Sequence, residues 1–200
     1  MTTIMIGKAD FAATPWWEAE PSRFARDQRE IAASFPELTW HAVGAGGWSG
    51  RLSMWPLRRP EPTGLAFLLG GRGLQVEIAY RQAYPMVPPR IFPVDPRPEP
   101  VECTQHQWHV NGDGSLCQFQ TDTAWDPRDS VCDIIIKAAA WRVEYALMKA
   151  GALEQMTLHG IVSDSSLDDL ITITGQQLDS TDAHQKAAES VPSVDAEEER

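Results

Sequence analysis

The residues best suited to chemistry lie together near the middle of the chain. Cys117 presents a thiol directly after a glycine-rich turn, and His106 and His109 lie a few residues before it. The glycines between residues 111 and 115 allow positive φ angles, so another chain can approach the sulfur closely. A thiol is a useful nucleophile where it is accessible, and a nearby imidazole can polarise a carbonyl or donate to an oxyanion. This pattern favours a catalytic Cys117 assisted by one of the two histidines.

Zinc binding is the second chemistry that this segment allows. The four potential ligands have the spacing Cys-x2-His-x2-His-x7-Cys and are Cys103, His106, His109 and Cys117. A zinc ion bound to Cys117 would occupy the thiol and prevent nucleophilic catalysis. Zinc does not account for the proline and tryptophan residues on either side of the segment, so it stays an alternative. Cys132 lies beside the apolar stripe of a predicted helix, which indicates a small core residue.

Charge and cysteine content argue against several classes of protein. The formal net charge of −11 argues against a nucleic-acid partner, because phosphates are bound by clusters of Lys and Arg. The three cysteines form no regular framework, which fits a reducing compartment. We expect no signal peptide, and no apolar run approaches the ~20 residues of a membrane-spanning helix. The sequence therefore predicts a cytoplasmic protein that binds neither nucleic acid nor a membrane.

Two helices are predicted to flank the segment that carries the thiol. The first begins near Ser22, which would be its N-cap. The second runs from about residue 131 to residue 150, with Asp129 or Ser130 as its cap and Gly151 at its end. Its buried stripe is predicted to consist of Val131, Ile134, Ile135, Ala138, Tyr145 and Met148. A further short helix is predicted at about 153–161.

Alternating apolar and polar residues predict an antiparallel meander between these helices. The predicted strands cover residues 38–43, 51–57, 65–69 and 74–80, with a short edge strand at 90–92. One helix, a meander and a long helix together predict an α+β fold.

Composition divides the chain into three parts. Residues 1–20 are expected to be an irregular N-terminal segment, and residues 21–162 a single domain. Residues 163–200 are rich in Ser, Asp, Gln and Glu and are expected to form a disordered acidic tail.

Three arginines recur at every third position of the first helix. Arg23, Arg26 and Arg29 are predicted to share one exposed face. That face is either simply solvated or a docking surface for a partner protein.

Three short motifs occur in order around the thiol. Their sequences are Tyr84-Pro85-Met86-Val87-Pro88-Pro89, Gly114-Ser115-Leu116-Cys117 and Trp125-Asp126-Pro127, the last beginning eight residues after the cysteine. They resemble the Tyr-Pro-x-x-Pro-Pro, Gly-x-(Ile/Leu)-Cys and Trp-x-Pro motifs of the ubiquitin-conjugating enzyme (UBC) family. The resemblance covers about residues 21–150 and is strongest to the bacterial members of antiphage and conjugation operons. It implies a UBC-like fold and a site framework of Tyr84, Pro85, Pro88, Pro89, Gly114, Trp125 and Pro127.

The resemblance also implies an activity. Cys117 would accept the C-terminal acyl group of another protein as a thioester and transfer it to a lysine amine, without a cofactor. The implied partners are an activating enzyme, a lysine-bearing target and an acyl donor. That donor would be a bacterial ubiquitin-like protein or, in cyclic-oligonucleotide antiphage (CBASS) operons, the C-terminus of a cGAS-like nucleotidyltransferase.

The sequence departs from the family pattern around the thiol. The family's His-Pro-Asn aligns without gaps to residues 107–109, so His109 takes the place of the Asn that serves the oxyanion or the loop. Asn111 is a second candidate for that role. About eight extra residues precede Cys117, and Lys149 stands where the family has an acidic residue. Relatives of the same fold that lack the cysteine are protein-binding modules, so a non-catalytic module is the other alternative.

Overall fold

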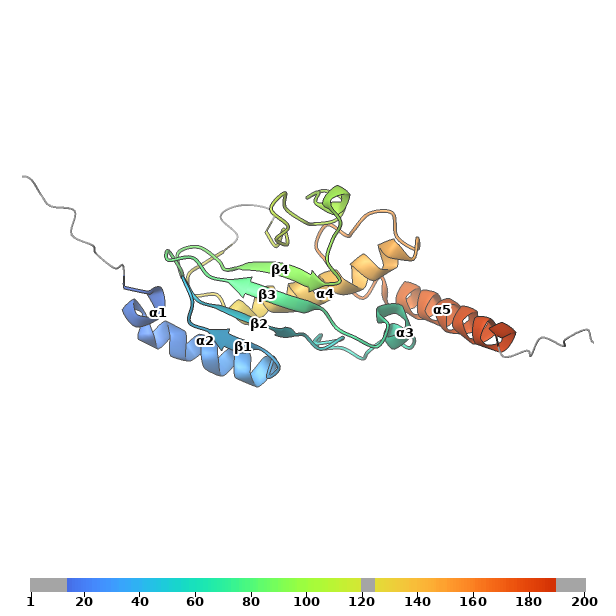
Figure 1. Ribbon diagram of the computed structural model, residues 1–200, viewed down its shortest axis with the longest axis horizontal. Helices are drawn as coiled ribbons and strands as arrows, with labels where there is room; N and C mark the ends of the chain where they lie inside the picture. The colour runs from blue at the N-terminus through green and yellow to red at the C-terminus, as the bar shows by residue number, and fades with distance from the viewer. Residues whose placement is uncertain (1–13, 120–124, 190–200) are drawn as a thin grey trace, which may run out of the picture.

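A four-stranded antiparallel sheet lies at the centre of the fold, with its strands in the order of the chain (Figure 1). The computed structural model describes residues 14–119 and 125–189, and for the last five of these only the backbone. The strands are β1 (Thr39–His41), β2 (Gly47–Arg51), β3 (Gln75–Ala79) and β4 (Arg90–Asp95). The helices are α1 (Trp16–Ala19), α2 (Pro21–Ser34), α3 (Leu65–Leu69), α4 (Val131–Lys149) and α5 (Asp168–Glu189), with a 3-10 turn, η1, at Pro100–Glu102.

The predicted α+β fold is confirmed, and its order is consistent with a UBC-like topology. Trp48 of β2 pairs with Ile78 of β3, which pairs with Ile91 of β4. All three side chains are buried, so they form one row on the covered face of the sheet. The predicted edge strand at 90–92 exists as β4 and continues to Asp95.

Helix α4 packs against two separate groups of apolar side chains. Its predicted stripe is buried, and together with Ile31 of α2 and Phe35 at the end of that helix it covers the sheet. The opposite side of α4, including Val143 and Leu147, packs on α3 and α5. Ser130 is its N-cap, because the Ser130 hydroxyl accepts a hydrogen bond from the Cys132 N–H at 3.1 Å.

The predicted strand at residues 65–69 is wrong, because this segment is the helix α3. Gly64 and Gly70 bound it with φ angles of 90° and 64°, which break an extended chain at both ends. The predicted strand at 51–57 is also displaced, since β2 ends at Arg51. Turns occupy residues 153–161, so the short helix predicted there is absent.

The N-terminal part of the domain begins earlier than predicted. Trp16 lies in the one-turn helix α1 and is 2% exposed, so residues 16–19 are not irregular as predicted. Its indole N–H donates to the Ala45 carbonyl at 2.7 Å, which attaches α1 to the meander. Pro21 takes the first position of α2, where its missing N–H costs nothing, and Ser22 is therefore not the N-cap.

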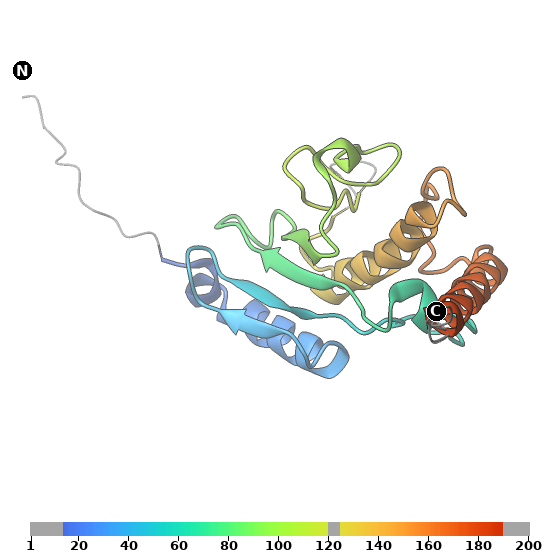
Figure 2. The same cartoon turned by 45° about the vertical axis from the view of Figure 1, so that its right-hand side comes forward.

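The acidic tail is not disordered over the part that the structure describes. Residues 168–189 form α5, which lies beside α3 in both views (Figures 1 and 2). Ile171 is fully buried in this contact, and the backbones of Gly64 and Gly175 approach so closely that a side chain at Gly175 would meet the Gly64 carbonyl. A docked apolar face thus orders a segment whose composition alone predicts disorder. No helix of the described residues is long and apolar enough to cross a bilayer.

Candidate active site

A short hairpin positions Cys117. Val110 and Leu116 form an antiparallel bridge, and the Cys117 N–H donates to the His109 carbonyl at 2.7 Å. The Leu116 N–H donates to the Ile91 carbonyl at 2.8 Å, so the hairpin is anchored on the edge strand β4. This places the thiol beside the sheet at the C-terminal end of the hairpin.

The turn of the hairpin satisfies its own polar groups. The Asp113 carboxylate accepts from the N–H and the hydroxyl of Ser115 at 3.0 and 2.6 Å. The Asn111 side chain donates to the Ser115 hydroxyl and the Leu116 carbonyl, at 3.1 and 3.2 Å, and accepts from Gln105 at 2.8 Å. Gly114 has a φ of 84°, which only glycine adopts readily. Asn111 therefore holds the loop and does not line the cavity described next.

Cys117 opens into a cavity of about 630 Å³. Three parts of the chain form its wall: the thiol segment, the middle of α4 and the turns at 155–162. The site residues His106, His109 and Cys117 share this cavity with polar and aromatic groups that the sequence did not single out. Among these are Phe119, Lys137, Trp141, Glu144 and Thr157.

The Cys117 thiol is half-buried and is not activated in the free protein. Its only recorded hydrogen bond among the described residues is a long one to the Phe119 carbonyl, at 3.7 Å. Burial raises the pKa of the Cys117 thiol above its ordinary value, because desolvation disfavours the thiolate. The thiol is therefore neutral near pH 7.

His109 lies next to the thiol in a constrained conformation. Its φ of 50° is the one positive value at a non-glycine residue in the described chain. Burial, with a smaller effect from the neighbouring His106, lowers the pKa of the His109 imidazole. A neutral imidazole cannot stabilise a thiolate as an ion pair, but it can donate an N–H to an oxyanion.

The framework residues pack behind the cavity. The Trp125 indole N–H donates to the Pro85 carbonyl at 2.8 Å, so the first and third motifs touch. The Tyr84 ring lies 6.4 Å from the Trp125 ring, and the Phe119 ring lies 6.2 Å from Trp125 on the side of the cavity. Pro89 is buried, whereas Pro88 and Pro127 are partly exposed.

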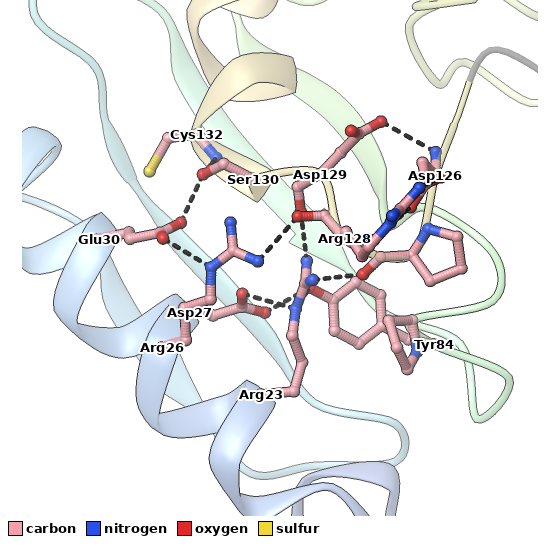
Figure 3. A network of polar contacts seen from close by, with 12 residues as sticks. Arg23, Arg26, Asp27, Glu30, Tyr84, Asp126, Arg128, Asp129, Ser130 and Cys132 are labelled. Atoms are coloured by element: carbon pink, nitrogen blue, oxygen red, sulfur yellow. Dashed lines mark hydrogen bonds and ion pairs between the residues drawn. The ribbon is translucent and has the colours of Figure 1, made fainter.

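The predicted exposed arginine face is wrong for Arg23. Figure 3 shows its guanidinium between Tyr84 and the loop before α4, where it donates to the Tyr84 hydroxyl and the Asp129 carbonyl at 2.7 Å each. It also donates to the Pro127 carbonyl and forms an ion pair with Asp27 at 3.0 Å. Arg23 is 9% exposed, so it is an internal link and not a docking residue.

Arg26 is also partly engaged within the molecule. It bonds Glu30 at 2.7 Å and the Arg128 carbonyl at 2.8 Å, and the Glu30 carboxylate accepts from the Ser130 hydroxyl at 2.6 Å (Figure 3). Arg29 is exposed, and its role in docking stays a prediction.

The extra residues before Cys117 are anchored on the C-terminal end of α4. Glu102 of η1 is 4% exposed and accepts from the Tyr145 hydroxyl at 2.8 Å and the Lys149 ammonium at 2.9 Å. These bonds lower the pKa of Glu102 despite its burial. Lys149 therefore has structural partners, Glu99 and Glu102, in this protein.

Hydrogen bonds and an arginine clamp fix the outer wall of the cavity. The Met156 N–H donates to the Gln107 carbonyl at 3.1 Å. The Arg59 guanidinium forms two 2.9 Å bonds with Asp168 of α5 and one of 2.7 Å with the Ile161 carbonyl. Helix α5 thus holds the cavity wall, a role that no local pattern indicates.

The structure does not assemble the four residues of the zinc alternative. Within residues 14–119 and 125–189, no three His, Cys, Asp or Glu side chains are placed where they could hold a metal ion. Cys103 lies outside the cavity, and its thiol contacts the Glu99 carbonyl at 3.6 Å. Cys132 is buried at the start of α4, as predicted.

Glu144 is the site residue that sequence reasoning missed. It is 2% exposed and lies on α4 among apolar positions, with its carboxylate lining the cavity. An acidic residue inside the predicted buried face of a helix is the signal that could have identified it.

Comparisons of the sequence with protein-family models and with curated proteins found no match.

Proposed function

We propose that this protein is an acyl carrier of the ubiquitin-conjugating type, with Cys117 as the acceptor. The support is a single arrangement: the thiol opens into a cavity, and the motifs around Tyr84 and Trp125 pack on each other, with Trp125 against Phe119 of the cavity wall. The anchored hairpin keeps the sulfur at a fixed place beside the sheet, as positional catalysis requires.

The proposed chemistry has two steps. In loading, the Cys117 sulfur attacks the thioester carbonyl on an activating enzyme, a new C–S bond forms, and the enzyme's thiol leaves with the proton. In discharge, a lysine amine attacks the Cys117 thioester, the C–N bond forms, and Cys117 regains its proton as the C–S bond breaks. We propose that the neutral His109 side chain, which lines the same cavity as the thiol, donates its N–H to the oxyanion of either tetrahedral intermediate.

The proposed partners follow from the motif resemblance. They are an activating enzyme, a lysine-bearing target and an acyl donor, which is a bacterial ubiquitin-like protein or a cGAS-like nucleotidyltransferase C-terminus. The setting that fits these partners is bacterial antiphage defence in the cytoplasm. The genes beside this one supply the candidates for the first assay.

A thioester assay tests the proposal. The chain is incubated with a candidate activating enzyme, acyl donor and ATP, and the adduct is separated with and without reductant. We expect a reductant-sensitive adduct that Cys117→Ala abolishes and that Cys103→Ala and Cys132→Ala retain. Cys117→Ser should give an ester that resists reductant. An adduct that survives Cys117→Ala would refute the assignment.

A further inference from the structure

The carboxylate of Glu144 has no part in the two steps above, although it lies in the same cavity as Cys117. It is 2% exposed, and it lines the cavity together with Ala140 of α4 and the turns of the outer wall. Desolvating a carboxylate is costly, so a buried one is retained only where its charge or its hydrogen bonds are used.

Among the described residues, one hydrogen bond from Thr157 accounts for one acceptor atom of Glu144. The Thr157 N–H donates to Oε2 at 2.6 Å, which fastens the outer wall to α4. A glutamine carbonyl would serve this bond equally well. Oε1 lies on the side of Gly160, where it is 3.8 Å from the place that a Cβ atom would take. The charge of the side chain is therefore not explained by the wall contact.

Among residues 14–119 and 125–184, no cation lies within ion-pair distance of the Glu144 carboxylate. None of the ion pairs within 4.0 Å among the described residues includes it. Lys137 lines the same cavity, but its ammonium donates to the Gln118 carbonyl at 3.3 Å and lies 4.9 Å from the centre of the Phe119 ring. The site thus combines a thiol, aromatic walls and a buried carboxyl group.

We propose that Glu144 is the counterion of the acceptor's ammonium group, so that the cavity selects a primary amine as the nucleophile for the Cys117 thioester. This inference rests on the function proposed above. Within a protein cavity, a carboxylate and an ammonium attract each other more strongly than the same two charges do in bulk water. The apolar stem of a lysine side chain would lie against Trp141 and Phe119, which line the path to the thiol.

The proton balance gives Glu144 a second task. The bound ammonium transfers one proton to the Glu144 carboxylate, and the neutral amine attacks the thioester carbonyl carbon. As the C–S bond breaks, a second proton passes from the nitrogen to the Cys117 sulfur. One ammonium, one carboxylate and one thioester thus become an amide, a carboxylic acid and a thiol, and Glu144 returns its proton to water.

Single-turnover discharge of a preformed Cys117 thioester is the first test. The nucleophiles are L-lysine, whose side chain is an ammonium, and hydroxylamine, which is largely neutral near pH 7. For Glu144→Gln we expect the ratio of the lysine rate to the hydroxylamine rate to fall about 100-fold, the lower end of general-base effects. Glu154→Gln, an exposed acid that does not line the cavity, should keep the wild-type ratio. An unchanged ratio in Glu144→Gln would overturn the inference, and equal losses with both nucleophiles would reduce Glu144 to a wall residue.

A second test needs no acyl donor. Iodoacetamide alkylation of Cys117 is followed by mass spectrometry with n-butylammonium or n-butanol present at equal concentration and ionic strength. We expect butylammonium to protect the thiol better than butanol in the wild type and equally to butanol in Glu144→Gln. Equal protection by both probes in the wild type would contradict an ammonium site. This readout stays valid if no thioester ever forms, so failure of the function and failure of the amine site are separable.

Discussion

The Nε atom of Arg23 donates a hydrogen bond to the phenolic oxygen of Tyr84, and the two atoms lie 2.7 Å apart. The same guanidinium reaches the backbone carbonyls of Pro127 and Asp129. One side chain of α2 therefore joins the Tyr-Pro motif to the segment that follows the Trp-x-Pro motif. The relative position of these motifs, and with it the back of the cavity, depends on this arginine.

Arg23→Ala should destabilise the fold strongly, because it leaves the buried Asp27 without its cation and two backbone carbonyls without their donor. Removing one partner of a buried ion pair costs about 3–5 kcal/mol. Arg29→Ala, on the same helix but exposed, should change the free energy of unfolding by less than about 0.5 kcal/mol. Denaturant unfolding of both variants measures the difference. Similar values for the two would show that the Arg23 contacts contribute nothing net.

His109→Ala should slow discharge of the Cys117 thioester by about 10²–10³-fold with little change in thermal stability, if the imidazole donates to the oxyanion. Asn111→Ala should instead lower the melting temperature, because its amide holds the hairpin through three hydrogen bonds. His109→Asn keeps a donor and tolerates the positive φ, so it should retain part of the rate. Normal discharge by His109→Ala would exclude the oxyanion role. A discharge defect in Asn111→Ala at unchanged stability would move that role to Asn111.

Alkylation of Cys117 should keep accelerating as the pH rises beyond about 8.5, the ordinary pKa of a thiol. Burial raises the pKa of Cys117, so the thiolate fraction is still increasing there. The rate of iodoacetamide modification of the Cys117 peptide, measured from pH 6 to 10 against a free cysteine peptide, reports this. A plateau near neutral pH would reveal a thiolate stabilised by its surroundings.

Glu144→Gln should stabilise the protein at neutral pH relative to the wild type. Burial raises the pKa of Glu144 in the folded state, with a smaller contribution from Asp164. A raised carboxyl pKa gives stability below the unfolded value of about 4.3, and this stability is lost as the pH rises through the folded value. The advantage of glutamine should therefore grow from about pH 4 to pH 7. The other titratable groups of the cavity, His106, His109, His159 and Lys137, are common to both proteins, so the difference isolates residue 144. An advantage that shrinks with rising pH would reverse the sign of the burial effect.

Helix α5 should contribute to stability through its first half only. Ile171→Ala should cost about 2–4 kcal/mol, because the isoleucine is fully buried against α3 and α4. Removal of residues 176–200 should leave the melting temperature almost unchanged, since the side chains from 176 to 184 are exposed. Thermal unfolding of the two variants separates the halves. A large loss from the truncation would show that the distal half also docks.

Local patterns in the sequence determined much of the framework. The alternation of Val76 and Ile78 identifies β3, the apolar stripe identifies α4, and Ser130 before that stripe marks its start. These features depend on periods of two and 3.6 residues and on a capping hydrogen bond, all of which act within one element. The glycine-rich turn before Cys117 was also predicted, but the hairpin that the Val110–Leu116 bridge closes around it was seen only in the structure.

Contacts between distant segments decided the rest. Arg23 falls on an apparently exposed face of its helix and becomes internal only because the loop before α4 covers it. Residues 65–69 are all apolar and show no regular alternation with polar residues, so the sequence allows either a strand or a helix there. The packing of Gly64 on Gly175 selects the helix. In the sequence, Glu144 is an isolated acid on α4. In the fold, the turns at 155–162 pack against it, and it lines the same cavity as Cys117. Whether a side chain is buried depends on which other segment packs on it, and the sequence pattern of one helix does not specify that segment.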